Sequence, residues 1–133
     1  MSIAIRRTSD EDRHGELTRP HSLSYRLARF ALELPAGALP EAVIERATLC
    51  IVDTVGVALA AAGYGLGTAG AKLALRDGGR AEATVWGFGR KARAVDVALA
   101  NGMLSHAMDY DDTNTAAIMH ASSVVVPTAI AVG

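Results

Sequence analysis

Between residues 23 and 34, apolar residues recur at the spacing of an α-helix. They lie three or four residues apart and form one stripe, which is typical of an amphipathic helix. Ser22 stands just before the stripe as a suitable N-cap, and Pro35 stands just after it, where a helix has to stop. The stripe consists of Leu23, Leu27, Phe30, Ala31 and Leu34.

A second, longer helix is predicted from Pro40 to about Ala62. Proline suits the first position of a helix, and Glu41 places a negative charge at the positive end of the helix dipole. From Ala47 to Ala62 the residues are apolar nearly all round. A helix that is apolar on all sides is typically buried, so we expect this one to lie in the core.

The rest of the pattern predicts two helices, a hairpin, an acidic loop and an apolar segment at the end of the chain. A β-branched and aromatic run beside glycines favours a small β-hairpin, and the segments around it have helical spacing. The fold class is therefore mainly α with one small β-hairpin. The predicted elements are a helix over 68–76, the hairpin over 84–91, a helix over 94–108, a loop over 109–121 and an apolar segment over 122–133 that Pro127 interrupts.

The two ends of the chain differ in character. Eight of the first twenty residues are charged and large apolar residues are sparse, so we expect residues 1–21 to be a flexible N-terminal tail. Residues 22–133 are then expected to form part of one helical domain. The last ten residues are uncharged and carry no polar stop signal, which predicts that this is the front part of something larger and only part of a complete domain.

Composition excludes several classes of protein. Thirteen basic and fourteen acidic residues give a net charge of −1, without the basic stripe that nucleic-acid binding requires. The single cysteine, Cys50, cannot form an internal disulfide. We find no secretory signal and no uncharged apolar stretch long enough to span a membrane. We therefore expect a cytoplasmic protein without nucleic-acid or membrane partners.

The candidate chemistry lies between Asn101 and Ser122. Three carboxylates occur within four residues, with His106 before them and His120 after them. His106 and Asp109 are three residues apart and would share one face of a helix. Neighbouring carboxylates raise one another's pKa, and a carboxylate beside an imidazole can serve general acid–base catalysis.

Two other interpretations of this stretch remain open. Acidic and threonine-rich loops between helices often contain only N-caps and solvated turns. Histidine and aspartate are also good metal ligands, but a ligand spacing such as His-Glu-x-x-His is missing, so we assign no metal.

The same region resembles the MmgE/PrpD family, which includes 2-methylcitrate dehydratase and cis-aconitate decarboxylase. The resemblance runs from about Leu23 to Gly133 and is most specific around the acidic loop. One departure is Ala121, where the family usually has a proline. The similar segments are Leu27–Phe30, Leu39–Pro40, Ala47–Gly56, Ala83–Gly87, Asn101–Gly102, His106, Asp109, Asp111–Thr113 and His120–Ser122.

The resemblance implies the N-terminal part of a helical domain whose lid domain is absent from this chain. Family members work as dimers on small polycarboxylates, without metal or organic cofactor. They dehydrate 2-methylcitrate-like substrates or decarboxylate aconitate-like ones by proton transfer. By matching, Asp109 and His120 would be catalytic. The supporting or substrate-binding residues would be His106, Asp112, Thr113, Asn101 and Ser122.

Three functional hypotheses follow. The chain is the N-terminal segment of a cofactor-independent lyase that is incomplete and inactive alone, with its substrate and reaction type open. Alternatively, it is an inactive helical remnant or interaction module of the same family. The third hypothesis is a metal-dependent hydrolase built on His106 and His120.

Overall fold

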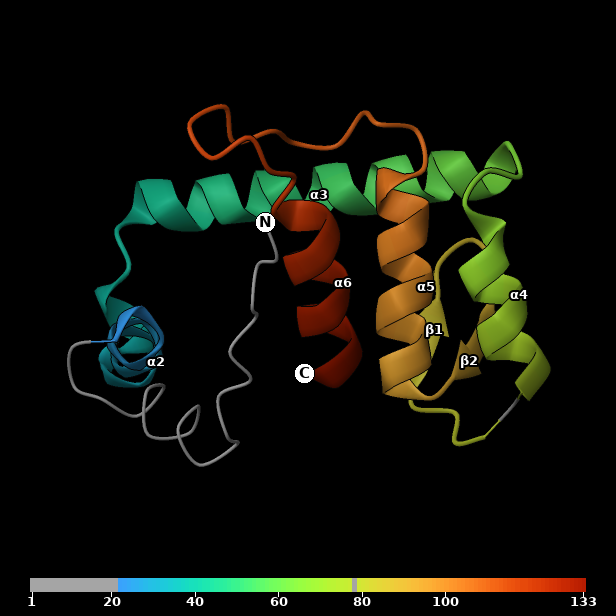
Figure 1. The fold of residues 1–133 in the computed structure, drawn as a ribbon, viewed down its shortest axis with the longest axis horizontal. Coiled ribbons are helices and arrows are strands. Elements are labelled where there is room, and N and C mark those ends of the chain that lie inside the picture. Colours follow the sequence, from blue (N-terminus) through green and yellow to red (C-terminus); the bar gives the residue numbers. More distant parts are fainter. Residues whose placement is uncertain (1–21, 78) are drawn as a thin grey trace, which may run out of the picture. The chain divides into compact units, whose positions relative to one another are not determined.

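A computed structural model describes residues 22–77 and 79–133 of the chain (Figure 1). The chain divides into two compact units, Met1–Pro40 and Glu41–Gly133, and each is described by itself. The predicted tail, residues 1–21, lies outside the described residues. The described part contains five α-helices and a two-stranded antiparallel sheet, which confirms the predicted fold class.

The described part of the first unit is an amphipathic helix and a short turn. Helix α2 covers Leu23–Glu33, and the Ser22 side chain accepts a hydrogen bond from Tyr25 N at 3.2 Å. The predicted N-cap is therefore confirmed. The helix ends as predicted before Pro35, and a 3₁₀ turn, η1, follows over Ala36–Ala38.

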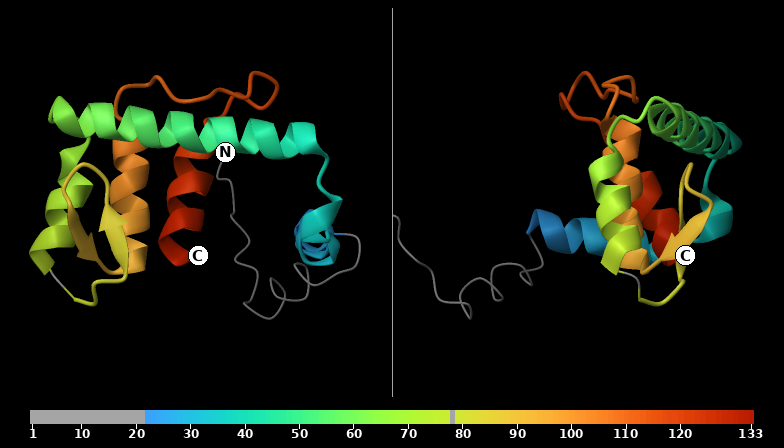
Figure 2. Two further views of the ribbon diagram at one scale, coloured as in Figure 1. Left: turned by 180° about the vertical axis from the view of Figure 1, so that it is seen from behind. Right: turned by 90° about the vertical axis from the view of Figure 1, so that its right-hand side faces the viewer.

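The second unit is built around helix α5. Helix α3 covers Glu41–Gly63, α4 covers Thr68–Asp77, α5 covers Ala94–His106 and α6 covers Ser122–Val132. Helices α4, α5 and α6 extend from the same side of α3, and α5 lies between the other two (Figures 1 and 2). Helix α5 contacts all three of the other helices and both strands, so it forms the centre of the unit.

The predicted hairpin is present. Strand β1 (Ala83–Val85) pairs antiparallel with β2 (Arg90–Ala92), with Ala83 opposite Ala92 and Val85 opposite Arg90. Gly87 in the connecting turn has a φ of +77°, and a Cβ there would lie 2.5 Å from the Ala62 Cβ of α3. Only glycine allows this turn to approach the helix so closely.

Small side chains make up most of the core. A cluster of buried residues joins α4, the hairpin and α5, and alanine is its commonest member. Alanine lets helix backbones approach closely. Gly102 does the same between α5 and α6, because a Cβ at this position would lie only 3.1 Å from Ser123 O. The buried cluster consists of Ala71, Ala74, Ala83, Val85, Ala92, Val97 and Ala100.

The expectation that α3 is buried all round is wrong in this structure. Thr54, Val57, Ala58 and Ala61 are buried, but Leu49 is 62% exposed and Val52 is 65% exposed. The apolar character of α3 therefore does not indicate burial on every side. Several of its apolar side chains are exposed instead, among them Val43 and Ile44.

The end of one helix and the course of another also differ from the prediction. Helix α5 ends at His106 rather than at Met108, because Ala107 begins a tight turn. Helix α6 continues through Pro127, which was expected to interrupt it. Proline lacks an N–H group, so it removes one helical hydrogen bond, but its ring is buried among the neighbouring elements.

Among the described residues, no single helix has both the length and the apolar character of a membrane span. Helices α3 and α4 meet those criteria only when taken together, and they are bent by 82° relative to each other.

Candidate functional site

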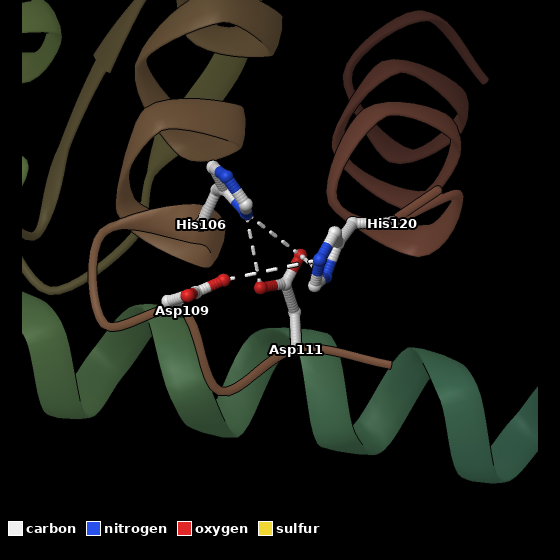
Figure 3. Close-up of side chains that lie close together, drawn as sticks. All are labelled: His106, Asp109, Asp111 and His120. Carbon is white, nitrogen blue, oxygen red and sulfur yellow. Dashed lines mark hydrogen bonds and ion pairs between the residues drawn. The ribbon is translucent and has the colours of Figure 1, made fainter. Parts of the chain in front are cut away.

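The candidate site lies where the 107–121 loop joins α5 to α6. His106 is the last residue of α5, and His120 precedes α6 by two positions. The loop folds back on itself through an antiparallel bridge between Asn114 and Met119. This return brings the side chains of His106, Asp109, Asp111 and His120 together (Figure 3).

Asp111 lies at the centre of this cluster. Its side chain has no exposed surface, although it carries a carboxylate. His106 Nδ1 lies 3.1 Å from Asp111 Oδ1 and 3.2 Å from Oδ2. His120 Nδ1 lies 3.4 Å from Oδ2 of the same carboxylate. One buried anion is thus shared by two imidazoles.

The surroundings of Asp111 lower its pKa. Burial is the largest influence and by itself raises the pKa, because it disfavours the charged form. Hydrogen bonds with His106, with the Ser123 side chain and with the Asp111 backbone act together in the opposite direction. Their combined effect is larger, so the pKa of Asp111 lies below its ordinary value of 3.8 and the group is an anion near neutral pH.

Asp109 and His120 face each other more loosely. His120 Nε2 lies 3.8 Å from Asp109 Oδ1, and the Asp109 side chain is 82% exposed. Asp109 adopts a φ of +50°, the left-handed conformation that aspartate tolerates better than most residues. The predicted catalytic pair is therefore close together, with room for solvent or a small molecule around the carboxylate.

Asp112 has a different partner from its neighbours. Its Oδ1 accepts a hydrogen bond from Ser122 N at 3.2 Å, so it satisfies a free N–H group at the start of α6. Ser123 Oγ donates to His120 O at 3.0 Å. These contacts hold the first turn of α6 against the loop, and Asp112 and Ser122 lie beside the cluster rather than in it.

Asn101 and Thr113 are also outside the four-residue cluster. Asn101 is 1% exposed and lies on the middle of α5. Its side chain accepts from Trp86 N at 3.0 Å and donates to Thr84 O at 3.1 Å, which ties the hairpin to α5. Thr113 is exposed on the loop.

Sequence reasoning did not single out Asp111. The acidic stretch contains three aspartates, and the pattern alone does not indicate which one turns inward. The flanking histidines, His106 and His120, could have indicated that one aspartate is buried, because a buried carboxylate needs hydrogen-bonding or charged partners. The expected helical face shared by His106 and Asp109 is wrong, because α5 ends at His106 and Asp109 follows in the turn.

The same four side chains could hold a metal ion. One donor atom from each, a ring nitrogen or a carboxylate oxygen, can be chosen so that all lie within 4.8 Å of one another. Imidazole and carboxylate suit Zn²⁺, Mn²⁺ and related ions. The geometry of these donor atoms is therefore compatible with the hypothesis of a metal-dependent hydrolase.

The structure thus defines a mainly helical domain with a carboxylate–histidine cluster at the junction of two helices. The sequence profile of the MmgE/PrpD N-terminal domain matches residues 25–133 of the 133-residue chain. The chain therefore belongs to the MmgE/PrpD N-terminal domain family, a family of lyases. Searches of curated proteins and of solved structures gave no match.

Proposed function

We propose that this domain supplies the acid–base groups of a lyase that acts on small polycarboxylates without a metal or organic cofactor. The observation that carries the proposal is the cluster itself, in which the buried Asp111 carboxylate lies between two imidazoles and Asp109 faces His120. Family membership supports the reaction class.

The chemistry begins with a weakly acidic C–H bond beside a carboxylate. His120 Nε2 accepts the proton, and the electron pair of the C–H bond moves into the adjacent carboxylate as enolate-like charge. In a dehydration, the electron pair returns to form the double bond while the hydroxyl group leaves. The leaving hydroxyl takes a proton from an acid, the role we propose for Asp109, and departs as water.

A decarboxylation would use the same pair in another order. The C–C bond to the leaving carboxylate breaks, carbon dioxide departs, and the remaining carbanion takes a proton from protonated His120. Both reactions need a group that exchanges protons near neutral pH, which histidine provides. The proposal therefore covers 2-methylcitrate-like and aconitate-like substrates.

The polycarboxylate also needs cationic groups to bind it. The family resemblance assigns these to a later part of the family's enzymes, together with the lid. We therefore propose that the 133-residue chain alone has no turnover. A homodimer and a cytoplasmic location belong to the same proposal.

Two other functions remain candidates. A metal-dependent hydrolase is favoured by one observation, the donor set of the cluster. An inactive interaction module is favoured by the exposed apolar residues of α3 and α6, which include Leu49, Val52, Val124 and Val125.

The test is turnover of 2-methylcitrate, citrate and aconitate by a complete lyase that carries this domain, after treatment with a chelator. Asp109→Ala and His120→Ala should each lower turnover by about 10²–10⁴-fold, the usual contribution of an acid–base group. Asp96→Ala is the matched control, because Asp96 lies at the opposite end of α5 and pairs with Arg93.

Each outcome separates the candidates. If both substitutions leave turnover within about threefold, the assignment of Asp109 and His120 is wrong. Activity that requires added metal would favour the hydrolase. Turnover by the 133-residue chain alone would contradict the proposal that the site is incomplete.

A further inference from the structure

We propose that Asp111 is the positioning residue of this site. It holds both His106 and His120 in the tautomer with the proton on Nδ1, which leaves Nε2 of His120 free to exchange protons. The expected effect of Asp111 on turnover rests on the proposed function. The tautomer assignment itself depends on the geometry of three side chains.

Asp111 contacts His106 through both oxygens of its carboxylate. Both oxygens of the carboxylate lie within 3.2 Å of His106 Nδ1. An ionised carboxylate can only accept hydrogen bonds, so the nitrogen that faces it has to carry the proton. A hydrogen bond at one ring nitrogen fixes which tautomer the histidine adopts.

His120 approaches the same carboxylate from the other side. Its Nδ1 atom is buried and makes no hydrogen bond in the structure, while Asp111 Oδ2 lies 3.4 Å away. A buried nitrogen without a partner is unfavourable, and a nearby anion stabilises the form in which that nitrogen is protonated. Asp111 Oδ2 therefore selects the Nδ1–H tautomer of His120 as well.

The other ring nitrogen of His120, Nε2, points away from Asp111 and toward Asp109. With Nδ1 turned toward Asp111, Nε2 of His120 faces Asp109 Oδ1 at 3.8 Å (Figure 3). In the Nδ1–H tautomer this nitrogen carries a lone pair and can accept a proton. Asp111 would also stabilise the imidazolium that forms, as a buried carboxylate does in other carboxylate–histidine pairs.

The charged groups around Asp111 are consistent with this role. His106 at the end of α5 and His120 in the loop both face the carboxylate. Asp109 is the second carboxylate of the cluster, but it is exposed and lies beside Nε2 rather than Nδ1 of His120. Asp111 is thus the carboxylate placed to set the tautomers.

The test is long-range ¹H–¹⁵N NMR of the histidine rings in the ¹⁵N-labelled 133-residue chain, with signals assigned by His106→Gln and His120→Gln. We expect both rings to show the Nδ1–H tautomer near neutral pH. Asp111→Asn, which keeps the shape and removes the charge, should shift His120 toward a mixture of tautomers. Asp109→Asn is the matched control and should leave both tautomers unchanged.

A spectrum of the unsubstituted chain with His120 in the Nε2–H tautomer would overturn the proposal, and this measurement needs no variant to fold. Equal effects of the Asp111 and Asp109 substitutions would overturn it too. In a complete lyase, Asp111→Asn should lower kcat with little change in KM, and Asp111→Glu should restore part of it. If the tautomers are as expected but His120→Ala retains full turnover, the proposed function fails and the positioning role stands.

Discussion

His106 and His120 lie edge to face, with ring centroids 5.0 Å apart and an interplanar angle of 62°. His106 ends α5 and His120 lies just before α6, and the two rings meet because the loop between them folds back on itself. Two protonated imidazoles at this distance would repel each other, and the Asp111 carboxylate lies where it offsets that repulsion. Asp111 therefore lies against both rings at the point where they meet.

The lowered pKa of Asp111 predicts a loss of stability in acid. Because the folded pKa lies below the ordinary 3.8, the unfolded chain binds more protons in acid than the folded chain does. The stabilisation is complete above 3.8 and is lost as the pH falls through the folded pKa. Urea unfolding from about pH 7 down to about pH 2 should show this decline.

Asp111→Asn is the corresponding variant. At neutral pH it should lower the free energy of unfolding by about 1–3 kcal/mol, because His106 loses its charged partner. The difference from the unsubstituted chain should shrink below about pH 4. Asp109→Asn should change stability little, since that side chain is exposed. A constant difference at every pH would contradict the assignment of the acid effect to Asp111.

Local patterns predicted the elements of this fold well. Ser22 has the short hydroxyl side chain that caps a helix, and the run from Ala83 to Val85 has the β-branched character of a strand, so both were identified without tertiary information. The exposure of Leu49 on α3 could not be predicted in this way. Apolar character indicates that a residue can be buried, whereas burial depends on which elements lie beside it.

The site was predicted by residue type but not in its geometry. Asp109, His106 and His120 were identified from the acidic loop and its flanking imidazoles, and the structure brings them together. Asp111 and Asp112 are adjacent, yet one turns into the cluster and the other caps α6. Successive loop residues have no fixed period, so their directions depend on turns that sequence patterns do not specify.

The buried side chain of Asn101 predicts a structural contribution separate from the site. Asn101→Ala would leave Trp86 N and Thr84 O without their side-chain partner, which should lower the free energy of unfolding by about 1–3 kcal/mol. Amide hydrogen exchange at Trp86 should accelerate. Asn114→Ala is the control, because its hydrogen bonds to Ala116 N and Ala117 N are exposed and should contribute less. Equal destabilisation by both variants would contradict this account.

Two glycines should respond to alanine in opposite directions. Gly67 has a φ of +63°, and a Cβ there would lie 2.6 Å from Ala107 Cβ and 2.7 Å from Met103 O. Gly67→Ala should therefore lower the melting temperature. Gly56 lies in α3 with nothing within 4 Å of an added Cβ, so Gly56→Ala should stabilise the helix by up to about 1 kcal/mol. Thermal unfolding of both variants checks this, and destabilisation by Gly56→Ala would contradict the open space at that position.

Metal removal distinguishes the two chemistries that the cluster allows. If the acid–base proposal is correct, dialysis against a chelator should leave the thermal unfolding of the chain unchanged, and metal analysis of the purified protein should find less than one ion per chain. A metal that binds the folded state would instead raise the melting temperature, and above Kd the rise should follow the logarithm of the metal concentration. His106→Gln would abolish such a shift, and that result would favour the hydrolase.

The exposed apolar surface of α3 and α6 predicts self-association of the 133-residue chain. Leu49 and Val125 are each 62% exposed, and they belong to a set of apolar side chains on these helices that the described residues leave exposed. Exposed apolar side chains in this number favour association, so light scattering should show an apparent mass that rises with concentration. Leu49→Glu combined with Val125→Glu should shift the chain toward monomer, because charged side chains oppose burial at a contact. Ile118→Asn is the control, since Ile118 is 88% exposed but lies on the 107–121 loop. A monodisperse monomer at every concentration would show that these faces do not drive association.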